Sequence, residues 1–303
     1  MKSLRHKGIL AVFLGVFLIT PVLYAAPQPN LGTTNTYSVL AGSYTNTAIG
    51  TVINGDLGYT TPPAVAPTVS GNTHVANAAY NQAGIDQASA LSELNSQPCT
   101  FTFPAGAKDL AIEAPFGNVG EYTPGVYCID GAVSIGGGGT ITLNGAGVYI
   151  FRSTGALSTS ANSIVTATGG GGASACNLFW TPGAATTLGA SSTFIGTIIN
   201  PAGITVGSTV NWTGRALAFG GTVATTTDTI NTVPVCSAAS APAASTTASG
   251  TNAAAATATT TSKTPGLPNS GGGAPAASLP LWAAPVAVIA FLSSASLVVR
   301  KRI

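Results

Sequence analysis

Ala190-Ser191-Ser192-Thr193-Phe194 is followed 18 residues later by Ser208-Thr209-Val210-Asn211-Trp212, and after 18 more by Thr226-Thr227-Asp228-Thr229-Ile230. Repetition at a short fixed period is typical of solenoids, in which each coil buries its apolar side against its neighbours. Side chains alternate across a strand, so the last column of the repeat predicts an inward ladder of Phe194, Trp212 and Ile230. The same alternation predicts an outward set of short, uncharged polar residues: Ser191, Thr193, Thr209, Asn211, Thr227 and Thr229. Asp228 falls at an inward position in this register, which is unusual for a carboxylate without a partner.

Short strands divided by glycine and serine extend this pattern over most of the body. They are expected near residues 37–40, 51–53, 55–58, 133–135, 141–143, 148–151 and 164–165. Thr45 and Thr47 repeat the chemistry of the outward set and are included in the candidate surface. A coil of 16 to 18 residues at about 3.3 Å per residue has a perimeter of roughly 55 to 60 Å, enough for three short faces.

One helix interrupts the strands. Apolar residues fall near helical spacing at Val75, Ala78, Ile85, Ala88, Leu91 and Leu94. Asn72 or Thr73 is the expected cap, and the helix should end before Pro98. This register turns Tyr80, Gln87 and Glu93 toward water.

The composition excludes several classes of protein. Charged residues make up only 6% of the 303 residues, which excludes charge-driven disorder and a basic nucleic-acid surface. The basic residues gather at the two ends, and the middle holds four of them against all eight acidic residues. Asp109, Glu113 and Glu121 are interpreted as solvated loop charges, and His74 as a solvated or capping residue. Arg215 is assigned a packing or hydrogen-bonding role. No convergent acid, base and cation are apparent, so we expect no enzyme activity, no cofactor and no metal site.

Both ends carry export and anchoring patterns. Residues 1–26, with a basic start, an apolar run and Ala25-Ala26, resemble a secretory signal peptide, the alternative being an uncleaved anchor helix. Residues 237–274 are rich in Ala, Ser, Thr and Pro, a composition that predicts a disordered stalk. Residues 275–303 contain an apolar segment, Leu279 to Val299, before a basic tail, which predicts a transmembrane helix with a cytoplasmic end.

A short motif lies within the predicted stalk. Leu267, Pro268, Asn269, Ser270 and Gly271 resemble a bacterial cell-wall sorting signal, although that pattern has Thr at the place of Ser270. Wall anchoring and plain membrane anchoring therefore both remain open. In either case the body, residues 27–236, is expected to be exported to the cell surface, or secreted if the anchor is cleaved.

Four cysteines, an even number, lie in the part expected outside the cell: Cys99, Cys128, Cys176 and Cys236. They predict two disulfides rather than a metal site. Three pairings are possible, and sequence order favours Cys99 with Cys128 and Cys176 with Cys236.

Several segments taken together are similar to the bacterial and fungal ice-binding protein family, often called DUF3494 or the type 1 ice-binding fold. The segments that carry this resemblance are residues 38–43, 55–58, 124–127, 148–151, 176–180 and 214–218, together with the Ala-rich helix. The resemblance implies a discontinuous right-handed β-solenoid of triangular cross-section, mainly β, with one long α-helix packed along it. It also implies a monomer that adsorbs to ice through one flat face bearing rows of Thr, Ser and Asn. On this reading the partner is an ice crystal surface with its ordered water, and no nucleic acid is expected.

Two other functions use the same architecture. A surface adhesin or carbohydrate-binding solenoid would expose aromatic residues in a groove, but Trp180 and Trp212 are expected to point inward. A β-helical polysaccharide lyase or hydrolase would need convergent carboxylates with a basic partner.

Overall fold

The structure of the protein is a computed structural model that describes residues 26–168 and 175–233. It contains one α-helix, α1 (Ala78–Ser96), and two short 3-10 helices, η1 (Gly32–Thr36) and η2 (Ala175–Asn177). The strands are β1 (Tyr37–Asn46), β2 (Val52–Asn54), β3 (Asp56–Tyr59), β4 (Thr68–Val69), β5 (Thr73–Val75), β6 (Phe101–Thr102), β7 (Lys108–Asp109), β8 (Glu121–Tyr122), β9 (Gly125–Ile129), β10 (Val133–Ile135), β11 (Thr140–Asn144), β12 (Tyr149–Ser153), β13 (Leu157–Thr159), β14 (Ile164–Thr168), β15 (Leu178–Pro182), β16 (Thr186–Leu188), β17 (Thr193–Ile199), β18 (Ile204–Val206), β19 (Asn211–Thr225) and β20 (Thr229–Asn231).

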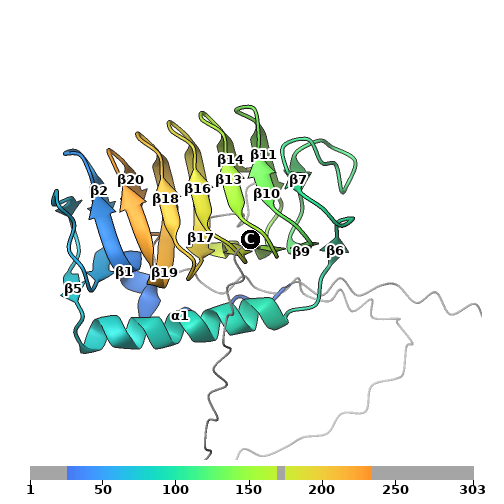
Figure 1. Ribbon diagram of the computed structural model, residues 1–303. Coiled ribbons are helices and arrows are strands. Elements are labelled where there is room, and N and C mark those ends of the chain that lie inside the picture. Colours follow the sequence, from blue (N-terminus) through green and yellow to red (C-terminus); the bar gives the residue numbers. More distant parts are fainter. Residues whose placement is uncertain (1–25, 169–174, 234–303) are drawn as a thin grey trace, which may run out of the picture. The chain divides into compact units, whose positions relative to one another are not determined.

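The strands stack in parallel as the coils of a solenoid with three faces (Figure 1). The broad face is formed by β8, β11, β14, the starts of β17 and β19, β20, β2 and β4. The narrow face is formed by β7, β10, β13, β16, β18 and the ends of β19 and β1. The helix face is formed by β6, β9, β12, β15, the end of β17, the middle of β19, the start of β1, β3 and β5. The mainly β, coiled architecture expected from the repeat is therefore confirmed.

The coils do not follow the order of the sequence. The N-terminal strand β1 pairs with β19, and β2 pairs with β20, so the first strands of the body lie beside the last ones. Helix α1 then runs along the stack and carries the chain to the opposite end, where β6 and β9 continue the solenoid (Figure 1). This arrangement agrees with the discontinuous solenoid implied by the family resemblance.

Helix α1 begins later than the sequence predicted. Residues 73–75 form β5, and the helix is capped by Asn77, whose side-chain oxygen accepts a hydrogen bond from the Tyr80 amide. The prediction of Asn72 or Thr73 as the cap was therefore wrong, because these residues still belong to the last coil of the solenoid.

The predicted orientation of the helix was also partly wrong. Tyr80 and Gln87 are buried, whereas Ile85 and Ala88 are exposed. The Gln87 side-chain oxygen accepts a hydrogen bond from the Phe219 amide at 2.9 Å, and the Tyr80 hydroxyl donates to the Ala41 carbonyl at 3.0 Å. These polar residues face the sheet because they satisfy backbone groups of the strands.

A column of aromatic rings fills the interior. Phe151, Trp180, Phe194 and Trp212 follow one another on successive coils, with ring centroids 4.5 to 5.5 Å apart. The two indole N–H groups donate to backbone carbonyls, that of Trp180 to Ile195 and that of Trp212 to Gly196. The prediction that both tryptophans point inward is confirmed.

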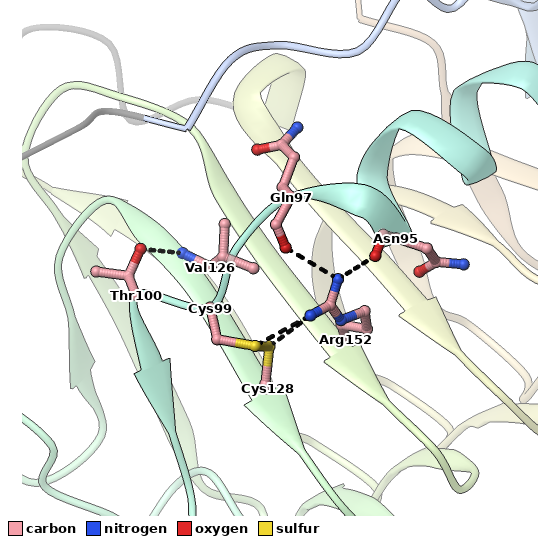
Figure 2. The surroundings of a disulfide bond; sticks show 7 residues. All are labelled: Asn95, Gln97, Cys99, Thr100, Val126, Cys128 and Arg152. Atoms are coloured by element: carbon pink, nitrogen blue, oxygen red, sulfur yellow. Dashed lines mark hydrogen bonds between the residues drawn. A yellow bond between two sulfur atoms is a disulfide. The ribbon is translucent and has the colours of Figure 1, made fainter.

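A disulfide joins the end of the helix to the helix face. Cys99 and Cys128 are bonded, as the sequence order favoured. The guanidinium of Arg152 lies beside them and donates to both sulfur atoms and to the carbonyls of Asn95 and Gln97 (Figure 2). Arg152 thus satisfies carbonyls at the C-terminal end of α1, which have no partner within the helix.

Several predictions fall outside the described residues. They concern the signal peptide, the stalk, the sorting-like motif, the anchor and Cys236, so the pairing of Cys176 with Cys236 stays a prediction. Within residues 26–168 and 175–233, no helix is long and apolar enough to cross a membrane.

Candidate functional site

The broad face carries two columns of outward side chains in strand register. The first column is Thr140, Ile164, Thr193, Asn211, Thr229, Val52 and Thr68. The second lies two residues farther along the same strands and contains Thr142, Thr166, Ile195, Thr213, Asn231 and Asn54. Neighbouring strands are about 4.8 Å apart and alternate residues about 6.6 Å apart, so the two columns form a regular grid.

Three of the six predicted outward residues lie in the first column. Thr193 pairs with Asn211, and Asn211 pairs with Thr229, while Phe194, Trp212 and Ile230 beside them are fully buried. The register derived from the 18-residue repeat is therefore confirmed on all three coils. Because no residue shifts between these coils, the outward side chains stay aligned from one coil to the next.

The other three residues, Ser191, Thr209 and Thr227, form a corner row at the edge between the narrow and broad faces. The hydroxyl oxygens of Ser191 and Thr209 lie 3.0 Å apart, and the Thr227 hydroxyl accepts a hydrogen bond from the Thr209 amide at 3.2 Å. Thr209 adopts a φ of 60°, and Ser191 a φ of 58°. A β-branched residue rarely takes this conformation, so the surrounding contacts must hold it.

Asp228 is fully buried beneath the corner row, at the inward position that the alternating register gave it. Its carboxylate accepts hydrogen bonds from the backbone amides of Val210, at 3.0 Å, and Thr226, at 2.8 Å. Burial raises the pKa of this carboxyl above 3.8, although the two amide hydrogen bonds act in the opposite direction. The inward position is possible because backbone donors, which the sequence pattern does not reveal, pair with the carboxylate.

Thr45 and Thr47 do not lie in the columns of the broad face. Thr45 pairs with Ala224 and points outward from the narrow face, where Ser134, Ser158, Thr187 and Thr205 occupy the same column. Thr47 follows the end of β1 and donates its amide to the carbonyl of Thr225. The structure thus brings six of the eight candidate residues together and places the other two elsewhere.

The sequence reasoning missed the second column of the broad face. Its members follow the first column by two residues on each strand, so strand alternation alone could have found them once the register was fixed. Asn54 and Asn231 in this column are joined by a side-chain hydrogen bond of 2.7 Å. The repeat was less visible here because Ile195 replaces a polar residue.

Charge is confined to one end of this surface. The second column continues onto β8, where Glu121 pairs with Thr142 at the end of the stack. Among the described residues of the two columns, extended in this way, Glu121 is the one that carries a charge. Hydrogen bonds from Asn144 and Asn118 lower the pKa of this carboxyl, so it is ionised at neutral pH.

The other two carboxylates interpreted as solvated loop charges, Asp109 and Glu113, instead pair with neighbouring groups. Asp109 accepts hydrogen bonds from the amides of Ala111 and Gly136, and Glu113 forms an ion pair with Lys108 at 3.7 Å. In the described part of the chain no group of three or more His, Cys, Asp or Glu residues could hold a metal ion. His74 lies in β5, 3.7 Å from Asp56 and within 3.4 Å of Asn77, the helix cap.

A family model, two protein sequences and a solved structure that resemble this chain are all described as ice-binding or ice-binding-like. The model of a family described as ice-binding-like matches residues 33–231. A protein of Nostoc sp. (strain HG1) named ice-binding protein is 32% identical over 243 residues, which is 76% of this chain and 84% of that protein. A second protein with this name, from Flavobacterium frigoris (strain PS1), is 29% identical over 62% of this chain and 71% of its own length. The crystal structure of an ice-binding protein from the Antarctic ascomycete Antarctomyces psychrotrophicus is 27% identical, with a TM-score of 0.57, over 69% of this chain and all of that one.

Proposed function

Because the chain belongs to the ice-binding-like family, we propose that it is an ice-binding protein that adsorbs to ice through the broad face and the adjoining corner row. The assignment to the broad face rests on one observation: Thr193, Asn211 and Thr229 stay in register across three coils. Two relatives that are 32% and 29% identical to it over the aligned residues, which make up most of their own length, are named ice-binding proteins.

The mechanism follows from the geometry of the grid. Side chains repeat at about 4.8 Å between coils and about 6.6 Å along a strand. Threonine is restricted at its first side-chain torsion, so each methyl and hydroxyl group keeps a defined place. The hydroxyl groups hold water molecules at fixed positions, while the methyl groups, with Ile164, Val52 and Ile195, keep bulk-like hydration weak. Water ordered in this way merges with the crystal lattice, and ice growth stops where the protein is bound.

The narrow face is the natural competitor, since it also carries hydroxyl groups in register. One column of such residues runs along its strands, interrupted by Ala224, and a second is limited to Ser43 and Thr222 on β1 and β19. The broad face presents two columns and borders the corner row, so it can hold more ordered water per coil. The third face is covered by α1, which packs on Leu40, Ile150 and Leu217.

Thermal hysteresis measurements on the purified protein test this proposal. Thr193→Tyr combined with Thr229→Tyr places two bulky rings in the middle of the broad face, and we expect hysteresis and crystal shaping to be lost. Both positions are at least partly exposed, so the variant should keep its fold, which circular dichroism and thermal melting check.

The matched control places the same two substitutions on the narrow face. Thr187→Tyr combined with Thr205→Tyr changes two exposed threonines on strands that pair directly, whereas Thr193 and Thr229 lie on either side of Asn211. This variant should retain the hysteresis of the parent protein. If the narrow-face variant loses activity and the broad-face variant keeps it, the assignment to the broad face is wrong. If the parent protein shows neither hysteresis nor crystal shaping, the adhesin or carbohydrate-binding alternative gains support.

We also propose that residues 27–236 act outside the cell, held by the stalk and anchor at residues 237–303. The Cys99–Cys128 disulfide supports this location, because disulfides persist mainly in oxidising compartments. Fractionation of expressing cells, with mass determination of the mature protein, distinguishes a wall-linked, a membrane-linked and a released form. Recovery of the unprocessed protein from the cytoplasm would contradict the proposal.

A further inference from the structure

One buried side chain per coil lies at the inner side of the corner between the narrow and broad faces. These inner corner residues are Ser163, Ser192, Val210, Asp228 and Thr51, and each is at most 1% exposed. Three of them donate a hydroxyl hydrogen bond to a carbonyl of the neighbouring coil: Ser163 to Ile135, Ser192 to Ser160 and Thr51 to Thr226. The inner corner residues therefore link successive coils directly below the proposed ice-binding surface.

Val210 interrupts this series, since its side chain has no polar group. Asp228 of the following coil links the two coils instead, and it does so by accepting a hydrogen bond rather than donating one. One carboxylate oxygen accepts from the Val210 amide at 3.0 Å, and the other accepts from the Thr226 amide of its own coil at 2.8 Å. A carboxylate suits this place because it accepts at both oxygens, whereas a hydroxyl group provides a single oxygen.

The two amides held by Asp228 adjoin the residues of the corner row. The Val210 amide follows Thr209, which has the left-handed φ of 60°. The Thr226 amide precedes Thr227, whose hydroxyl accepts from the Thr209 amide. The backbone on one side of each threonine is thus fixed by the same buried carboxylate.

We propose that Asp228 is a positioning residue for ice adsorption, which holds the hydroxyl groups of Thr209 and Thr227 in register with Ser191. This inference rests on the proposed function of the surface above it. Without the carboxylate the amides of Val210 and Thr226 lose this partner, and the backbone that follows Thr209 is held less firmly in a conformation that β-branched residues disfavour. The corner row would lose its alignment while the two columns of the broad face, set by strand pairing, remain.

The test compares Asp228→Asn with the core variant Ile150→Val, which removes a methylene group from a fully buried residue on the helix face. Each change is expected to lower the stability by a small and comparable amount, which thermal melting checks. The asparagine amide presents an N–H donor to one of the two backbone donors, so one contact is lost. We expect hysteresis of Asp228→Asn to fall severalfold at equal concentration, measured well below its melting temperature, while hysteresis of Ile150→Val is unchanged. Amide hydrogen exchange should become faster at Val210 or Thr226 in the asparagine variant only.

Two results would overturn the inference: unchanged hysteresis in Asp228→Asn, or an equal fall in Ile150→Val, which would show an effect of stability alone. If the asparagine variant fails to fold, Asp228→Ser replaces it in the test, because serine is already the inner corner residue of another coil, at Ser192. It should show a fall of the same kind, and full activity would count against the proposal. Because Thr193→Tyr with Thr229→Tyr tests the broad face independently, an active Asp228→Asn beside an inactive tyrosine variant leaves the proposed function intact.

Discussion

Two aspartates of this protein have their pKa values shifted in opposite directions. Asp228 is buried, and desolvation raises the pKa of its carboxyl. Asp86 on α1 accepts hydrogen bonds from the hydroxyl and the amide of Thr33, at 2.6 and 2.7 Å, and these bonds lower its pKa. A raised pKa in the folded state stabilises the protein at low pH, and a lowered one stabilises it at higher pH.

The two carboxylates therefore predict opposite pH dependence of stability. The stability advantage of the parent protein over Asp228→Asn should be largest below pH 3.8 and should narrow as pH rises through the raised pKa. Its advantage over Asp86→Asn should be present above pH 3.8 and should disappear as pH falls through the lowered pKa. Thermal melting of the three proteins across the acidic range measures both trends, and parallel trends for the two variants would contradict the assigned environments.

Single residues of the repeat could be predicted well from the sequence. The inward and outward positions of Thr193, Phe194 and Asp228 follow from strand alternation and an 18-residue period alone. The partners of Asp228 could not be predicted, because they are backbone amides of its own turn and of the neighbouring coil, and depend on how the corner folds. Thr45 was misplaced for a related reason: it resembles the outward set in chemistry but lies on a strand of another face.

At the level of elements, α1 is attached by apolar packing along its length and by polar contacts and a disulfide at its C-terminal end. Over its length of about 28 Å the helix packs through the small Ala83 and Ala90 and the larger Tyr80 and Leu94. The disulfide and Arg152 hold its C-terminal end (Figure 2). The existence of the helix was evident from the sequence. Its orientation was not, because Tyr80 and Gln87 are buried by hydrogen bonds to particular strand residues.

Removal of the disulfide should weaken the fold without changing the proposed ice-binding surface. Cys99→Ser combined with Cys128→Ser opens a loop of 29 residues, and the chain-entropy treatment gives a loss of about 3.6 kcal/mol in the free energy of unfolding. Hysteresis measured near 0 °C should stay at the parent level, because the broad face lies on other strands. Chemical denaturation measures the first effect, and a loss of hysteresis in the folded variant would show that the helix end influences the surface.

At the scale of the whole molecule, the pairing of β1 and β2 with β19 and β20 builds the surface from both ends of the folded body. Val52 and Thr68, from the first strands, extend the column that Thr193, Asn211 and Thr229 begin. The resemblance to a known family implied such a discontinuous arrangement, whereas local periodicity could not reveal it. Pairing between segments so distant in sequence leaves no trace in either segment alone.

The central claim is that the broad face, rather than the narrow face, binds ice. Growth of a single ice hemisphere from a dilute mixture of three differently labelled proteins tests it directly: the parent, Thr193→Tyr with Thr229→Tyr, and Thr187→Tyr with Thr205→Tyr. The parent and the narrow-face variant should be incorporated into the ice, and the broad-face variant should remain in the liquid. Incorporation of the broad-face variant together with exclusion of the narrow-face variant would contradict the claim.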